Sequence, residues 1–243
     1  MTVASGSRLD TAPALVRVLG GFDVLVEHQH LSLPTQAQRV VGYLAVTQRT
    51  TRRDALAGRL WPFSTQHRAQ ANLRTAIWRI NQASNRVVVT DRNLVRLDDD
   101  VDVDAQVVGL VARDLIAATV EDDIATSVLS LLELNLLPGW DDDWLVVERE
   151  RLRQLRVHAL ESLSRSLAAC GRFSEAIDAA ISAVAAEPLR ESAHTALIEV
   201  YVAEGNVSEA SLEMESYQSL LQAELGIRPS NRFRALLDQT PTP

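Results

Sequence analysis

Cysteine and lysine are the residues that this sequence has least of. The single cysteine, Cys170, excludes an internal disulfide and a zinc site built from several cysteines. All 24 positively charged side chains are arginines, and the codon bias of a GC-rich genome explains this without any functional meaning. Cys170 precedes Gly171 at a predicted helix end, so we expect it to be a small buried residue.

Long apolar segments are also missing. The chain has no run of 18 apolar residues and no apolar N-terminal segment of the kind found in signal peptides. These absences predict a soluble, cytoplasmic protein that has no membrane partner. The 243 residues, 47% of them hydrophobic, are enough for two domains with a core in each.

Charge is distributed unevenly along the chain. Residues 1–97 contain 13 arginines and 5 acidic residues, a net charge of +8. Residues 98–243 contain 11 arginines and 27 acidic residues, a net charge of -16, which gives the total of -8. Such asymmetry predicts a part that binds a polyanion, joined to a part with another task.

Residues 67–83, HRAQANLRTAIWRINQA, have the periodicity of a helix with one buried side. At about 100° per residue, five apolar side chains share one arc: Ala69, Leu73, Ala76, Ile77 and Ile80. The opposite arc carries cations and hydrogen-bonding groups but no carboxylate, whereas an ordinary surface helix mixes charges. Its members are Arg68, Arg74, Thr75, Trp78, Arg79 and Gln82. This face predicts a polyanion as the partner.

The segments before this helix predict a sheet and two shorter helices. Apolar runs around Gly20-Gly21 indicate a β-hairpin over residues 15–33. A first helix opens at Pro34-Thr35 with Thr35 as its cap, and its inward residues are Val40, Val41 and Leu44. A second helix is predicted from about Thr51 to Leu60, ending before Pro62.

The segment after the helix predicts a second hairpin. Residues 87–90 and 94–97 are strand-like and flank the turn Asp91-Arg92-Asn93. A sheet, three helices and a closing two-stranded wing make up a winged helix-turn-helix, in which the third helix enters the major groove of DNA. His28 and His30, at the far turn of the first hairpin, lack a third ligand nearby, so we expect solvated turn residues and not a metal site.

An acidic run marks the predicted boundary between the two parts. Asp98, Asp99, Asp100, Asp102 and Asp104 alternate in a way that suggests a calcium loop. Such a loop needs a glycine and a bidentate glutamate at positions that hold valine and glycine here. A solvated linker that leads into a helix is the better prediction.

The second part is predicted to be helical and contains an internal repeat. Residues 171–176, GRFSEA, recur as residues 205–210, GNVSEA, at an offset of 34. A period of 34 residues, with glycine ending the first helix of each pair, is typical of tetratricopeptide helix pairs. We expect residues 104–137 to supply a further pair and residues 232–237 to cap the stack.

Motifs in both parts resemble the SARP family, the Streptomyces antibiotic regulatory proteins. They are RVLGGF (17–22), ALAGRLWP (55–62), ANLRTAIWRI (71–80), LPGWDDDWLVVERE (137–150), PLRESAHTA (188–196) and ELGIRPS (224–230). The resemblance implies an OmpR-like winged helix followed by a helical bacterial transcriptional activation domain. No Gly-rich Walker motif is present, so the chain is similar to the small form of the family.

The predicted fold class is an α+β winged helix-turn-helix domain followed by an all-α domain of tetratricopeptide-like repeats. The predicted divisions are a flexible N-terminus (1–13), a winged-helix DNA-binding domain (14–98) and an activation domain (99–243). The resemblance implies an activator that binds direct repeats near promoters, for a secondary-metabolite gene cluster. Double-stranded DNA, RNA polymerase and sigma factor are the expected partners, and two protomers could pair on DNA.

Several side chains are predicted to contact DNA. Arginine grips guanine O6 and N7 bidentately, so we expect Arg74, which projects furthest outward, to read a base. We expect other side chains to contact the phosphate backbone or the shape of a groove. They are Arg52, Arg53, His67, Arg68, Thr75, Arg79 and Arg92. Trp78 could also contact DNA, although packing against the wing is slightly favoured because a large apolar side chain usually finds a protein neighbour.

The helical part shows no catalytic constellation. Trp140 and Trp144 flank three aspartates, for which an anchor in protein packing is favoured over a ligand site. His158 and His194 occupy nearly equivalent repeat positions and need neither metal nor catalysis to explain them. We therefore expect no enzyme activity, cofactor or metal. Two alternatives stay open: control of DNA binding by a ligand or peptide on the repeats, or an adaptor that binds no DNA.

Overall fold

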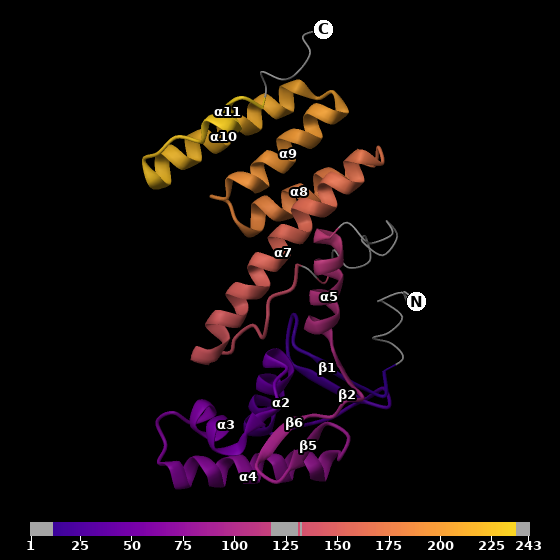
Figure 1. The fold of residues 1–243 in the computed structure, drawn as a ribbon, viewed down its shortest axis with the longest axis vertical. Helices are drawn as coiled ribbons and strands as arrows, with labels where there is room; N and C mark the ends of the chain where they lie inside the picture. The colour runs from indigo at the N-terminus through magenta and orange to yellow at the C-terminus, as the bar shows by residue number, and fades with distance from the viewer. Residues whose placement is uncertain (1–11, 118–130, 132, 237–243) are drawn as a thin grey trace. The chain divides into compact units, whose positions relative to one another are not determined.

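The computed structural model describes residues 12–117, 131 and 133–236, and it divides into two compact units. Unit 1 comprises residues 1–110 and 134–152, and unit 2 comprises residues 111–133 and 153–243. The predicted flexible N-terminus lies almost entirely outside the described residues. Each unit is described by itself below (Figure 1).

Unit 1 begins with a four-stranded sheet. The strands are β1 (Ala14–Arg17), β2 (Asp23–Val26), β3 (Gln29–His30) and β7 (Val101–Val103), in the order β3-β2-β1-β7. The predicted first hairpin is confirmed, since β1 pairs antiparallel with β2 and β2 with β3. The prediction of a solvated linker after residue 97 is wrong. Val101 and Val103 are buried, and β7 pairs parallel with β1.

Asp104 ends this strand and begins helix α5 (Asp104–Ile116). Its carboxylate is buried and accepts hydrogen bonds from the backbone N–H groups of Val18, at 2.9 Å, and Leu19, at 3.0 Å. Burial raises the pKa of Asp104, and these hydrogen bonds oppose that change. The last acid of the run therefore ties the end of β1 to the start of α5.

Three helices pack together in unit 1: α2 (Thr35–Thr47), α3 (Arg53–Leu60) and α4 (Gln66–Ala83). The inward positions predicted for α2 are confirmed, because Val40, Val41 and Leu44 are buried. Thr35 is not the cap. Pro34 occupies the N-cap position of α2, and no side chain caps this helix.

A three-stranded sheet carries the wing. Strands β5 (Val88–Asp91) and β6 (Leu94–Leu97) form the predicted hairpin. The wing is not two-stranded, however, because β4 (Thr51–Arg52) pairs with β6. The residues predicted to begin the second helix thus lie in a strand, and α3 begins only at Arg53. The short segment is extended because it fills the free edge of the hairpin.

Residues 134–152 fold with unit 1, so the predicted boundary at residue 98 does not coincide with the division into compact units. Trp140 lies against Gly42 of α2 and its ring is 5.5 Å from that of Phe22. Trp144 packs edge-on against Tyr43, with 5.0 Å between ring centroids. The two tryptophans are therefore anchors in protein packing. The functional boundary between the domains stays a prediction.

Unit 2 is built from helices that follow one another along the chain (Figure 1). They are the C-terminal part of α7 (Asp143–Ala169), α8 (Phe173–Ala186), α9 (Glu191–Glu204) and α10 (Val207–Leu225). The predicted 34-residue repeat is confirmed: Gly171 follows α7 and Gly205 ends α9, with φ angles of 75° and 93°. Only glycine adopts such angles without strain. Of the further pair expected from residues 104–137, the first helix is present as α5, and residues 118–130 and 132 lie outside the described residues.

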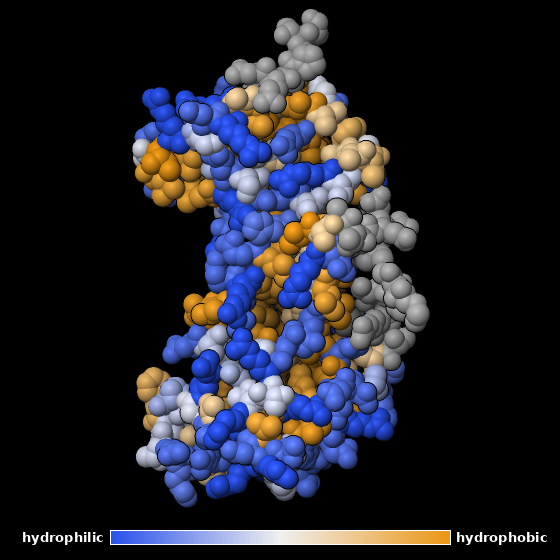
Figure 2. Space-filling view, in the orientation of Figure 1, coloured by the Kyte–Doolittle hydropathy of each residue, from blue (hydrophilic) through white to orange (hydrophobic). Residues whose placement is uncertain are grey.

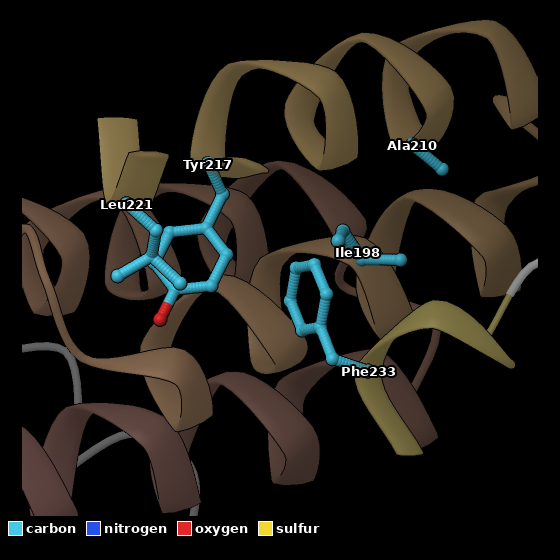
Figure 3. Close-up of a cluster of buried hydrophobic side chains, with 5 residues drawn as sticks. All are labelled: Ile198, Ala210, Tyr217, Leu221 and Phe233. Atoms are coloured by element: carbon cyan, nitrogen blue, oxygen red, sulfur yellow. The ribbon is translucent and has the colours of Figure 1, made fainter. Parts of the chain in front are cut away.

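The short helix α11 (Asn231–Arg234) packs at the end of unit 2 through a cluster of buried hydrophobic side chains. The cluster consists of Ile198, Ala210, Tyr217, Leu221 and Phe233. Figure 3 shows the ring of Phe233 directed toward Tyr217 and Ile198. The Tyr217 and Phe233 ring centroids are 4.9 Å apart. Tyr217 also stacks on buried His194, whose Nδ1 lies 2.5 Å from Oε1 of Glu213. This packing confirms the predicted cap around residue 232.

The fold class predicted from the sequence is confirmed, although several local predictions are wrong. Unit 1 is an α+β winged helix and unit 2 is all helical within the described residues. Cys170 is exposed and not buried, because it lies in the turn after α7. In the part of the chain that the structure describes, no helix is long and apolar enough to cross a membrane.

Candidate nucleic-acid interface

Helix α4 is held in place by its apolar side and by a cap. The five residues predicted to face inward are all buried, with Ile80 completely enclosed. Thr65 occupies the N-cap position, where its hydroxyl accepts a hydrogen bond from the backbone N–H of Arg68. The helix packs against α2 and α3. These contacts fix which side of α4 reaches the surface.

The outward side of α4 carries positive charge only. Arg68, Arg74 and Arg79 are exposed, as are Thr75 and His67, which is the arrangement predicted. No acidic residue occurs between Gln66 and Ala83. Figure 2 shows a mainly hydrophilic surface over this end of unit 1. The face therefore has the charge and exposure that binding to a phosphate backbone requires.

Trp78 is 52% exposed on the outward side of α4, and its packing against the wing stays a prediction. The guanidinium carbon of its neighbour Arg79 lies 4.8 Å from the centre of a Trp78 ring. This cation–π contact holds the arginine beside the indole and leaves part of the ring open to a ligand.

Arg53 and Arg74 line one small hollow between α3, α4 and the wing turn. The hollow has a volume of about 150 Å³, and Gln70 and Asn93 also line it. The backbone N–H of Arg53 donates to the carbonyl of Asn93 at 2.8 Å, which joins the start of α3 to the wing. The buried Nε of Arg53 has no hydrogen-bond partner among the described residues. This donor is closed off from solvent, and the acid Asp54 also lines the hollow.

Arg52 has a different environment from Arg53. Its guanidinium donates two hydrogen bonds to the Asp54 carboxylate, at 3.1 and 3.0 Å. These contacts lower the pKa of Asp54 and raise the pKa of Arg52. Arg52 is thus already neutralised by a neighbour that sequence reasoning did not connect with it, although a spacing of two residues at a strand end suggests such a pair.

Arg92 sits at the tip of the wing. It is exposed and adopts a φ of 47°, so the turn between β5 and β6 places it at the outermost point of the hairpin. The structure brings Arg53 and Arg74 together, whereas Arg68, Arg79 and Arg92 are separate points on the exposed surface. No side-chain hydrogen bond or ion pair joins these three arginines to an acid among the described residues.

The charge asymmetry is local and does not separate the two compact units. Unit 1 as a whole contains 15 arginines and 15 acidic residues, because residues 98–104 and 141–150 fold with it. The excess of arginine in residues 1–97 is thus compensated within the same unit. What distinguishes the candidate interface is the single sign of charge on α4.

Comparisons with known proteins agree with both parts of this fold. Residues 126–239 match the family model of the bacterial transcriptional activator domain. The solved structure of Mycobacterium tuberculosis EmbR in complex with a low-affinity phosphopeptide is similar, with a TM-score of 0.72 and 23% sequence identity. The likeness covers 96% of this chain and 67% of EmbR. The likeness to EmbR shows the fold, and the family match shows a bacterial transcriptional activator domain in residues 126–239. No curated protein matches this sequence.

Proposed function

We propose that the regulator binds double-stranded DNA through the exposed face of α4, with the helix in the major groove. The observation that carries this proposal is the presence of three exposed arginines and no carboxylate on an 18-residue helix. A winged helix presents its third helix to the groove in this way. The fold of unit 1 supports the assignment, because α2 and α3 hold α4 by its apolar side alone.

The proposed roles of the side chains follow from their positions. Arg74 reads a base, since it is central on α4 and lines the hollow that it shares with Arg53. Arg53 binds a phosphate through the part of its guanidinium that lines the hollow. The remaining proposed contacts, mainly to phosphate and sugar, are Arg52, His67, Arg68, Thr75, Trp78, Arg79 and Arg92.

We also propose that unit 2 contacts the transcription machinery. The match to a bacterial transcriptional activator domain supports an activator that binds direct repeats and recruits RNA polymerase or its sigma factor. Apart from the four-residue helix α11, every described helix of unit 2 carries acidic residues, so protein is the better partner for it. A secondary-metabolite gene cluster is the proposed target, on the resemblance to the SARP family.

The base-reading role of Arg74 can be tested against a phosphate contact on the same helix. Footprinting across the genes adjacent to the regulator's own gene would first locate its site. Arg74→Ala and Arg68→Ala are then titrated against this DNA and a scrambled duplex. We expect Arg74→Ala to lose about 1–3 kcal/mol of discrimination between the two duplexes. Arg68→Ala should weaken both complexes alike. Unchanged discrimination in Arg74→Ala contradicts the proposed role.

A further inference from the structure

A second and larger hollow lies in unit 1, beside the loop that joins α3 to α4. Its volume is about 750 Å³, within the range of sites that hold small organic molecules. One wall is formed by residues 58–64 and the other by residues 141–151. Both walls belong to unit 1. None of the proposed DNA contacts lines this hollow, so it is a separate feature of the regulator.

Two tryptophans line the hollow, and only one of them has a hydrogen-bond partner. The Nε1 group of Trp61 donates to Oε1 of Gln36 at 2.9 Å. Trp144 is 9% exposed, and its buried Nε1 has no acceptor among the described residues. Buried indole N–H groups usually have an acceptor. A small rotation of the Trp144 side chain, which lines the hollow, would bring this unsatisfied N–H to a ligand there.

Opposite charges face each other across the same hollow. Arg39 pairs with Asp142, and Arg151 pairs with Glu148 at 2.8 Å. Two arginines and two aspartates stay without an ion pair or side-chain hydrogen bond among the described residues. The arginines are Arg49, in the loop after α2, and Arg59, on α3. The aspartates, Asp141 and Asp143, belong to the wall formed by residues 141–151. A ligand with one negative and one positive group can pair with an arginine and with an aspartate at the same time.

Apolar side chains supply the rest of the surface. Phe63 is 99% exposed and Val147 is 55% exposed, and both line the hollow together with Pro62. A phenylalanine that is completely exposed gains free energy when an apolar group covers it. The ligand therefore needs an apolar body between its two charged groups.

We propose that this hollow binds a small zwitterion with an apolar side chain, of the amino acid or short peptide class. The carboxylate pairs with Arg49 or Arg59 and the ammonium group pairs with Asp141 or Asp143. An oxygen of the ligand accepts the hydrogen bond of Trp144 Nε1, and its side chain packs on Phe63 and Pro62. The proposal does not depend on DNA binding, since no residue is shared with the candidate interface.

The chemistry of the ligand is tested by calorimetric titration of the full chain with four compounds. They are L-phenylalanine, the dipeptide L-phenylalanyl-L-leucine, 3-phenylpropanoate, which lacks the ammonium group, and phenethylamine, which lacks the carboxylate. We expect one of the two zwitterions to bind at a 1:1 ratio, at least about tenfold more tightly than either singly charged compound. Comparing the affinities of L-phenylalanine and the dipeptide shows whether the hollow binds a free amino acid or a short peptide. Equal affinity for all four compounds, or no binding, overturns the proposal.

Variants locate the site. Trp144→Phe removes the indole N–H and keeps an aromatic ring, and Trp140→Phe is its matched control, because Trp140 does not line the hollow. Arg59→Gln is paired with Arg228→Gln, an exposed arginine of unit 2. We expect Trp144→Phe and Arg59→Gln to weaken binding about fivefold or more, and the controls to change it less than about twofold. Arg59 is exposed, so Arg59→Gln should fold even if Trp144→Phe does not. Equal effects in site and control variants contradict the location.

Discussion

Helices α4 and α10 are nearly the same length, 18 and 19 residues, and each carries surface charge of one sign only. Helix α4 has three arginines and no acid, whereas α10 has four glutamates and no arginine. Both bury an apolar stripe in their own unit. The buried stripe therefore fixes where each helix lies in the fold, and the exposed charge determines which partner it can approach.

The contrast between these helices is sharper than the contrast between the two halves of the sequence. Counting along the chain places the positive charge in residues 1–97, but unit 1 as a compact body has equal numbers of arginines and acids. Ten of its fifteen acids lie in residues 98–104 and 141–150, and none lies on α4. A polyanion is thus attracted to one face and not to the whole unit.

Charge reversal on α4 should have the largest effect. We expect Arg68→Glu, Arg74→Glu and Arg79→Glu together to weaken DNA binding by about 100-fold or more, since three phosphate or base contacts become repulsive. The matched variant replaces Glu209, Glu215 and Glu224 of α10 by glutamine. Fluorescence anisotropy with the footprinted duplex should show that this variant binds within about threefold of the wild type. A similar loss in both variants contradicts the contrast between the helices.

Asp104 is a buried acid that stabilises unit 1, unlike the exposed glutamates of α10. Asp104→Ala leaves the N–H groups of Val18 and Leu19 unpaired, and we expect it to lower the free energy of unfolding by about 1–3 kcal/mol. Urea denaturation measures this change. Glu215→Ala on α10 is the control, because it removes an exposed acid, and it should cost less than about 0.5 kcal/mol.

The pH dependence of Asp104 has a definite sign. Burial raises its pKa above the ordinary value of 3.8, so folding binds a proton between the ordinary and the raised pKa. The contribution to stability is complete below pH 3.8 and is lost as the pH rises through the raised pKa. The difference in unfolding free energy between wild type and Asp104→Asn should therefore decrease over this window. An increase over the same window contradicts the assignment.

Replacing Asp54 should change DNA affinity less than the substitutions on α4 do. It tests whether this acid weakens the attraction of the nearby arginines for DNA. Its carboxylate binds Arg52 and lines the hollow of Arg53 and Arg74, so it competes with a phosphate for these cations. We expect Asp54→Asn to raise DNA affinity about two- to fivefold at low salt. Anisotropy titrations at two salt concentrations should show the gain shrinking as salt rises. A loss of affinity would mean that the pair holds Arg52 in its binding position.

The sequence predicted α4 well because its stripe is regular. All five buried residues and the exposed arginines follow from the helical period alone. The same is true of the 34-residue repeat, in which Gly171 and Gly205 mark the turns. The winged-helix order of hairpin, helices and wing was also readable, since turn residues separate the apolar runs.

Contacts between distant segments could not be predicted. Strand β7 looks like a linker because only two of its residues are apolar, and its partner β1 lies more than 80 residues earlier. The packing of Trp140 on Gly42 joins segments nearly 100 residues apart. Local periodicity carries no information about such pairs. For the candidate site, exposure and charge sign were predictable, but the Arg52–Asp54 pair and the unpaired Nε of Arg53 required the structure.

The salt dependence of DNA binding tests the central claim most directly. The affinity of the wild type for the footprinted duplex is measured between low and physiological salt, and log K is plotted against log salt concentration. If about four arginines of unit 1 each neutralise a phosphate, the slope should be about -3.6, at about -0.9 for each contact. The variant with Arg68, Arg74 and Arg79 reversed should give a much shallower slope. A wild-type slope near zero contradicts the assignment of α4 as a DNA-binding helix.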